Sequence, residues 1–358
     1  MRRVFIAPSR LSFCSSVCRA GISAAVVAFA TGCGTSPDSS TVPDRLPPAE
    51  QGVGPVLLED FSARQVFPPD NWWNLDISSA PVDANSTDYL QWLGLTKRLH
   101  PDFGPPPYGI PYCGVPDTQP LEQVEFIWWP EESDPGAPGY SPGYPIPVQA
   151  RTQANWIEGG VPGGGTSGDR HLLVIDRVRW LLFETYATRW NSSLNRWEAG
   201  NGAVWNLATN DRRPEGWTSA DAAGLAIFPG LIRWDEASSG QPIRHALRAT
   251  VRATNGYVWP ASHEAGDTEG ALPMGARLRL KSTVPIDGYD PMVQRIFQAM
   301  KTYGLIIADN GSDIYITGTM DPNWDNDILN PAFHALHASD FDVVELGWNP
   351  VNSGVEER

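Results

Sequence analysis

Trp197-Glu-Ala-Gly-Asn-Gly-Ala-Val-Trp-Asn-Leu207 places an Asn-Gly pair between two runs that are rich in strand-forming residues. Asn-Gly accepts the positive φ angles of a tight turn and is the strongest short-range signal of a β-hairpin. The same pair recurs at Asn255-Gly256 and Asn310-Gly311, again between strand-like runs. The sequence therefore predicts three hairpins.

Other segments extend this pattern. Residues 171–175 and 180–186 read as a fourth antiparallel pair, and 277–281 alternates as a strand with one solvated face. Helices are few: 291–303 has apolar residues at helical spacing before Gly304, and shorter helices are expected at 327–337 and 230–237. We predict a mainly β protein, an antiparallel β-sandwich or jelly roll with a few peripheral helices.

The N-terminus predicts export. Residues 1–32 combine four arginines, an apolar run too short to cross a bilayer, and small residues before Cys33. This is the pattern of a bacterial lipoprotein signal, with Cys33 as the lipidated residue; plain secretion is the alternative. Residues 33–56 are rich in Ser, Pro, Thr and Asp, which predicts a disordered tether. Residues 57–358 are then expected to form a single β-rich globular domain.

Charge limits the partners. Residues 1–32 hold four of the 26 basic and none of the 41 acidic side chains, so the remaining chain carries a formal charge of −19. Such acidity argues against nucleic acid, and the membrane is expected to be reached only through the lipid. Cys113 would be the only other cysteine of the exported chain, so an intrachain disulfide is excluded and a buried thiol is expected. The oligomeric state is not indicated by the sequence.

Fifteen tryptophans are an unusual number for this length. Aromatic faces pack against the C–H faces of sugars, and exported Trp-rich β-proteins often bind glycans. Core packing is the alternative explanation for any one ring. The candidates for sugar binding are Trp128, Trp129, Trp156 and Trp217.

Four residues are candidates for catalysis. His171 precedes a strand whose partner carries Glu184 on an apolar face, where burial would raise the carboxyl pKa. Asp221 lies in the polar loop 216–224, although a place in the first turn of a short helix capped by Ser219 explains it slightly better. His245 faces apolar neighbours, as buried structural histidines also do. Arg248 on the same strand and Asp309 at a predicted turn are candidate substrate contacts.

Two metal sites are weaker candidates. Asp321, Asn323, Asp325 and Asp327 alternate as calcium ligands do, but the glycine and the closing acid of a calcium loop are missing. Capping of a helix by Asp325 is the preferred explanation. His334 and His337 with Asp340 have zinc-like spacing without a further ligand. We therefore expect no cofactor, with calcium as the alternative.

Several segments are familiar in combination. They are Gly216-Trp-Thr-Ser-Ala-Asp-Ala-Ala-Gly-Leu225, His245-Ala-Leu-Arg248, Tyr257-Val-Trp-Pro-Ala-Ser-His263, Pro273-Met-Gly-Ala-Arg-Leu-Arg-Leu-Lys281 and Tyr303-Gly-Leu-Ile-Ile-Ala-Asp-Asn-Gly311. Together they resemble a group of exported microbial proteins over residues 65–345. The resemblance implies one extracytoplasmic domain and transfers no catalytic residue.

These observations favour a surface-anchored carbohydrate-active protein, a polysaccharide hydrolase or lyase. A carboxylate pair with histidine would act in a Trp-lined cleft. The alternative is a non-catalytic lipoprotein that binds glycans or the cell envelope through the same aromatic residues.

Overall fold

The computed structural model describes residues 54–350. The predicted signal peptide, Cys33 and nearly all of the predicted tether lie outside the described residues. The chain groups into two units, 1–47 and 48–358, and every described residue belongs to the second. Between residues 54 and 350, no helix is both long and apolar enough to span a membrane. The first strand contains Val56, so regular structure begins within the last residues assigned to the tether.

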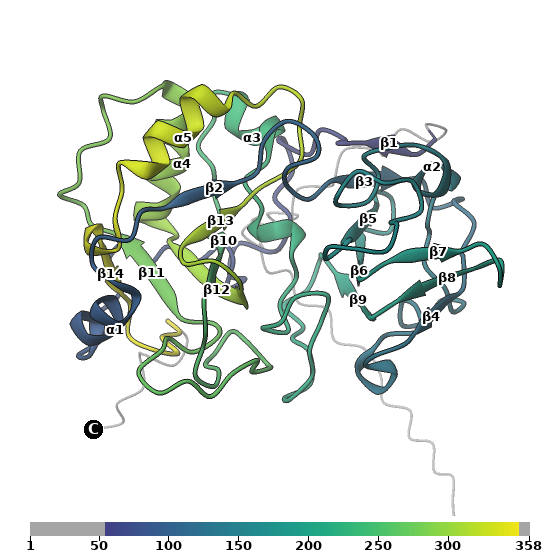
Figure 1. Ribbon diagram of the computed structural model, residues 1–358, viewed down its shortest axis with the longest axis horizontal. Helices are drawn as coiled ribbons and strands as arrows, with labels where there is room; N and C mark the ends of the chain where they lie inside the picture. The colour runs from purple at the N-terminus through teal and green to yellow at the C-terminus, as the bar shows by residue number, and fades with distance from the viewer. Residues whose placement is uncertain (1–53, 351–358) are drawn as a thin grey trace, which may run out of the picture. The chain divides into compact units, whose positions relative to one another are not determined.

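Strands dominate the described residues, with five short α-helices among them (Figure 1). The strands are β1 (Val56–Leu57), β2 (His100–Asp102), β3 (Tyr112–Val115), β4 (Val124–Phe126), β5 (Leu172–Asp176), β6 (Leu181–Tyr186), β7 (Arg189–Asn191), β8 (Arg196–Ala199), β9 (Asn201–Asn206), β10 (Leu247–Val251), β11 (Arg277–Leu280), β12 (Leu305–Asn310), β13 (Tyr315–Thr317) and β14 (Phe341–Val343). The helices are α1 (Ser86–Leu93), α2 (Val148–Thr152), α3 (Trp234–Ser238), α4 (Pro291–Thr302) and α5 (Asn326–His334), with 3₁₀ turns η1 (Pro130–Glu132), η2 (Phe228–Gly230) and η3 (Ala338–Asp340).

The strands form three sheets, in the orders β1-β3-β5-β6-β9, β14-β11-β12-β10-β13-β2 and β4-β8-β7. The mainly β class is confirmed, but the sheets are mixed and not purely antiparallel. β3 pairs with β5, β10 with β12, β13 with β2 and β4 with β8 in parallel. Parallel partners need a long connection, and each of these pairs is separated by many residues along the chain. The described sheets do not establish a sandwich.

The hairpin predicted at Asn201-Gly202 is wrong. β8 pairs with β7 and β4, whereas β9 pairs with β6 in the neighbouring sheet. Gly202 is needed for space and not for a positive φ, because a Cβ there would lie 2.6 Å from the ring of Phe126 and the hydroxyl of Tyr144. The side-chain amide of Asn201 donates to the carbonyl of Ser219.

The other two Asn-Gly pairs also fail to make hairpins. β10 lies between β12 and β13, so the strands on either side of Asn310-Gly311 do not pair with each other. At Asn255-Gly256 the chain turns, with φ +66° at Gly256, but Tyr257 forms only an isolated parallel bridge to Met274. A local turn signal does not identify the strand that completes the sheet.

Other predicted elements are confirmed. β5 and β6 form the expected antiparallel pair, β11 occupies the alternating segment, and α4 ends before Gly304, whose φ is +77°. The helices predicted at 327–337 and 230–237 correspond to the shorter α5 and α3. Cys113 is buried, as expected.

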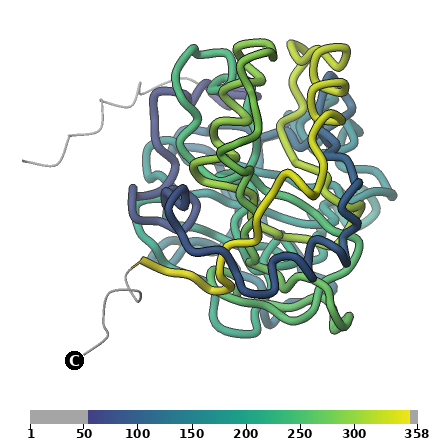
Figure 2. Tube along the Cα trace, turned by 90° about the vertical axis from the view of Figure 1, so that its left-hand side faces the viewer, coloured from purple at the N-terminus to yellow at the C-terminus, as the bar shows by residue number. Residues whose placement is uncertain are grey.

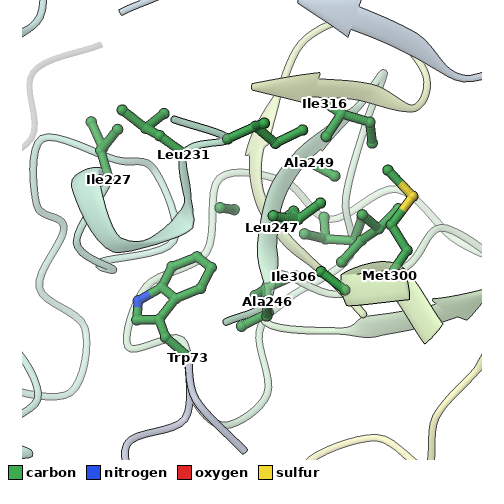
Figure 3. Packing of buried hydrophobic residues seen from close by; sticks show 14 of the residues in the cluster. Trp73, Ile227, Leu231, Ala246, Leu247, Ala249, Met300, Ile306 and Ile316 are labelled. Carbon is green, nitrogen blue, oxygen red and sulfur yellow. The ribbon is translucent and has the colours of Figure 1, made fainter. Parts of the chain in front are cut away.

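One large apolar cluster packs between the five- and six-stranded sheets. Trp73, Leu231 and Leu247 belong to it, and Figure 3 shows them with neighbours from β12, β13 and α4. A Cβ at Gly230 would lie 2.6 Å from the Trp73 ring, so glycine allows η2 to approach this core. Along the edge of the larger sheet, the segment before α1 runs beside β14 (Figure 2), where Val82 bridges Val344.

Candidate functional site

Arg248 on β10 is the centre of a buried hydrogen-bond network. Its Nε and Nη2 donate to the two carboxylate oxygens of Asp221 at 2.7 and 2.8 Å. Nη1 donates to the hydroxyl of Thr317 on the neighbouring β13 at 2.7 Å, and Nη2 donates also to Asp309 at 2.9 Å. The guanidinium and Asp221 are buried, with side-chain exposures of 4% and 0%. The two carboxylates raise the pKa of Arg248 above its usual range although burial opposes its charge.

The loop that carries Asp221 is held by its own small polar residues. The hydroxyl of Ser219 donates to the carbonyls of Asp221 and Leu225 at 3.0 and 2.6 Å, and it accepts from the Asp221 amide at 2.9 Å. Gly224 adopts φ +69°, and a Cβ there would lie 2.1 Å from the hydroxyl of Ser262. The Gly-Trp-Thr-Ser-Ala-Asp segment is therefore a folded support for one carboxylate. Asp221 itself has no access to a substrate.

Asp309, near the end of β12, is half-buried, whereas Asp221 is fully buried. Its side chain keeps 29% of its surface while its oxygen accepts from Arg248. β10 and β12 change register between Ala249 and Thr250, and Thr250 is the residue that pairs with Asp309. Burial raises the pKa of Asp309 to about 6: the Arg248 charge lowers it, but the charge of Asp221 adds to the rise. A carboxyl with this pKa gains and loses a proton under mild conditions.

His171 joins the five-stranded sheet to this network. Its Nδ1 lies 2.7 Å from the Glu158 carboxylate, and its Nε2 lies 3.2 Å from the carbonyl of Ala220, which precedes Asp221. Burial disfavours the imidazolium, but Glu158 outweighs burial and raises the pKa of His171 to about 9. Desolvation likewise opposes ionisation of Glu158, yet His171 lowers the pKa of that carboxyl. The pair is therefore an ion pair at neutral pH.

Three more polar residues surround the network. The Asp102 side chain, at the end of β2, is exposed, yet surrounding protein displaces enough water to raise its pKa, against the charges of His100 and Arg248. The charge of Asp169 raises it further, and the hydroxyl of Tyr186 donates to Asp169 across 3.5 Å.

An aromatic series leads away from these carboxylates. The Tyr186 ring lies 5.4 Å from that of His171 and 5.7 Å from that of Trp128, and Trp128 contacts Trp129 edge-on at 5.8 Å. Trp128 and Trp129 remain 53% and 39% exposed. Their backbone amides both donate to the carbonyl of Gly200, so the junction of β8 and β9 holds this pair.

Glu184 lies in a different environment from the one the sequence suggested. It is fully buried on β6, and its carboxylate accepts from the amides of Ile227 and Phe228 and from Nε1 of Trp205, at 2.9 to 3.1 Å. Burial raises its pKa to about 7, against those hydrogen bonds. The raised pKa that the sequence predicted is present, but the group holds η2 against the sheet and does not reach solvent.

The remaining candidates are held by other contacts. His245 is bound to Glu236 at 2.9 Å and to the carbonyl of Ala246 at 2.8 Å. Trp156 is buried, with Nε1 donating to Gln153. Trp217 is partly buried, and the guanidinium of Arg213 lies 5.2 Å from its ring.

The two metal candidates are occupied by other contacts. Asp325 caps α5 by accepting from the amide of Asp327 at 2.9 Å, and Asp321 accepts from the amide and side chain of Asn323. His334 lies 3.3 Å from His100. In the described part of the chain, no group of three or more histidine, cysteine or carboxylate side chains is arranged to hold a metal ion.

The structure brings some of the sequence candidates together and not others. His171, Asp221, Arg248 and Asp309, chosen separately, are brought together. Glu158, Asp102 and Tyr186 were not singled out, because the segments that carry them are joined only by the tertiary fold. No family model, curated protein or solved structure matches the chain.

Proposed function

We propose that this protein is an exported glycoside hydrolase that acts on an uncharged polysaccharide. The observation that carries the proposal is Asp309: a solvent-reachable carboxyl, fixed by Arg248 and with a pKa of about 6, beside further carboxylates. A carboxylic acid that keeps its proton near neutral pH can protonate the oxygen of a glycosidic bond as it breaks. Arg248 and Asp221 would act as positioning residues for this acid.

Hydrolysis also needs a second carboxylate, which activates water or attacks the sugar. Two exposed carboxylates, Asp102 and Asp169, interact electrostatically with groups of this network, and Asp102 is our candidate. Its exposure supports a direct role, in contrast to the buried Asp221.

The charges favour a hydrolase over a lyase. A lyase acting on uronic acids needs a cation to neutralise the substrate carboxylate. Arg248 is almost fully buried and donates to protein oxygens through Nε, Nη1 and Nη2, and His171 is paired with Glu158. Asp102 and Asp169 would repel an anionic chain. An uncharged glycan avoids this repulsion and can stack on Trp128 and Trp129.

The test is a screen of residues 50–358 against neutral and uronate polysaccharides, scoring reducing ends, unsaturated products and binding. We expect cleavage of a neutral glycan that falls as pH rises above about 6, because Asp309 then loses its proton. Asp309→Asn should lower kcat at least ~100-fold, whereas the exposed control Asp211→Asn should not. Trp128→Ala should mainly raise KM, by roughly tenfold.

A non-catalytic glycan-binding protein is the second candidate, supported by the exposed Trp128 and Trp129. Retention of a glycan without product, unchanged in Asp309→Asn and lost in Trp128→Ala, would establish it. Unsaturated products, or full activity in Asp309→Asn, would overturn the hydrolase proposal.

We also propose that Cys33 is lipidated and anchors the exported protein to the cell envelope. Support comes from the arginine-rich, apolar and small-residue pattern that precedes it. In a bacterial host, the full chain should take up labelled fatty acid and partition with membranes, and Cys33→Ser should take up no label. A wild-type chain that takes up no label, or a Cys33→Ser chain labelled equally, would overturn the anchor.

A further inference from the structure

One cavity elsewhere in the molecule shares no residue with the Arg248 network. It has a volume of about 260 Å³ and lies between the segment 62–66 and the segment 239–245 that leads into β10. A single water needs only about 10–15 Å³ of such space, so the cavity has room for a small ligand. Its walls are Ser62, Ala63, Arg64, Gln65, Val66, Asn74, Pro229, Arg233, Glu236, Ser239, Gln241, Pro242, Arg244 and His245.

The cavity is cationic in a strongly acidic protein. Three arginines line it, Arg64, Arg233 and Arg244, against the single carboxylate of Glu236. Glu236 is already engaged, by Arg233 at 3.0 Å and His245 at 2.9 Å. Desolvation opposes its charge, but these two partners lower the pKa of Glu236 and keep it ionised. Within residues 54–350, neither Arg64 nor Arg244 has a carboxylate at ion-pair distance.

Two guanidinium groups in these walls have unused donors. Arg233 has a side-chain exposure of 3%, and its Nη1 is buried without a hydrogen-bond partner among the described residues. Nε of Arg64 is also buried and has no hydrogen-bond partner among the described residues. Leaving a buried donor unpaired costs about 1–3 kcal/mol, more when it is charged.

Arg64 and Arg233 are held in place without a ligand. Arg64 stacks on Trp180 at 3.2 Å from the ring centroid, and its Nη1 donates to the carbonyl of Arg177 at 3.1 Å. Arg233 lies 5.1 Å from the Phe228 ring and pairs also with Asp235 at 3.2 Å. Such pre-organisation reduces the entropy lost on binding.

We propose that this cavity binds a tetrahedral oxyanion of the phosphate class, as the free ion or as a monoester. Arginines from three segments line the cavity, and Arg is the residue best suited to hold the several oxygens of a tetrahedral anion. A planar carboxylate offers only two oxygens to the same walls. The site stands independently of the glycan hydrolase proposal.

The test is isothermal titration of the chain with inorganic phosphate, sulfate and acetate at constant ionic strength. We expect one saturable phosphate site, with similar binding of sulfate and at least tenfold weaker binding of acetate. Arg244→Gln changes an exposed side chain and should weaken phosphate binding at least tenfold, as should Arg64→Gln. Arg196→Gln, on the three-stranded sheet, is the matched control.

Circular dichroism of each variant separates loss of the site from loss of the fold. No saturable heat up to about 10 mM phosphate would overturn the proposal. Unchanged binding in both folded variants, or acetate binding equal to phosphate, would also overturn it.

Discussion

Glu184 illustrates how one buried carboxyl can look catalytic and be structural. Three N–H donors from η2 and β9 converge on it, and these bonds favour the ionised form. Burial outweighs them and raises the pKa to about 7. In the folded protein this group therefore binds a proton more tightly than in the unfolded chain, whose carboxyl titrates near 4.5.

Replacing Glu184 by Gln should remove part of the pH dependence of stability. The folded pKa lies above the unfolded one, so the free energy of unfolding of the wild type should fall as pH rises from about 4.5 to about 7 and then level off. This group should account for at most about 3 kcal/mol of the fall. Glu184→Gln cannot ionise, so its free energy of unfolding should fall less over this range. Urea unfolding at several pH values measures both, with the exposed Glu345→Gln as control. Parallel curves for wild type and Glu184→Gln would contradict the assignment.

The His171–Glu158 pair gives a second prediction for single residues. Burial alone disfavours the imidazolium, so Glu158→Gln should move the His171 pKa from about 9 to below 6.5. NMR titration of the histidine ring measures this midpoint directly. Because the folded pKa of His171 is raised, the pair should stabilise the protein fully between about pH 4.5 and 6.5, and this contribution should disappear as pH rises through about 9. The pKa of Glu158 is lowered, so the contribution should also be lost in acid, as Glu158 gains a proton. Glu125→Gln, in an exposed ion pair, should leave the midpoint unchanged; a midpoint still near 9 in Glu158→Gln would be inconsistent with this account.

At the scale of elements, periodicity identified β5, β6, β11 and α4, since their patterns come from local burial. The Asn-Gly pairs gave wrong hairpin predictions because two of these glycines are present for other structural reasons. Gly202 makes room for Phe126 and Tyr144, and Gly311 leads out of β12 beside Thr250 of β10. A turn signal reports local backbone freedom, whereas strand partners depend on contacts between distant segments.

Helix α5 distinguishes capping from calcium binding. Asp325 accepts from the Asp327 amide, as an N-cap residue does. Asp325→Ala should therefore lower the free energy of unfolding by about 1 kcal/mol, equally in chelator and in calcium. Asp287→Ala, outside any helix, is the control. If calcium stabilised the wild type and not Asp325→Ala, the capping explanation would fail and the calcium site would be supported.

For the whole molecule, the sequence predicted the mainly β class but not the mixed pairing. More than fifty residues connect the parallel strands β3 and β5, and β11 and α4 lie between β10 and its partner β12 in the sequence. The residues of the candidate site are likewise far apart in the sequence. Asp221, Arg248 and Asp309 meet because β10 is inserted beside β12, a placement that spacing along the chain does not encode.

The core that joins the two larger sheets gives the last prediction. Phe228 is fully buried, and its ring contacts Tyr112 of β3 at 4.8 Å and Phe61 at 6.0 Å, while its amide donates to Glu184 of β6. Because the same apolar cluster continues into β10, β11 and β12, the two sheets should unfold together.

Phe228→Ala should then cost about 3–5 kcal/mol and lower the stability of both sheets equally. Tryptophan fluorescence and far-ultraviolet circular dichroism should give one coincident transition in wild type and variant, and hydrogen exchange in β5 and β10 should accelerate together. Tyr108→Ala, at a 63% exposed ring, should change the free energy by less than about 0.5 kcal/mol. Two separated transitions, or faster exchange in β5 alone, would show that the sheets are independent folding units. The Arg248 network, which has residues from both sheets, could then open without global unfolding.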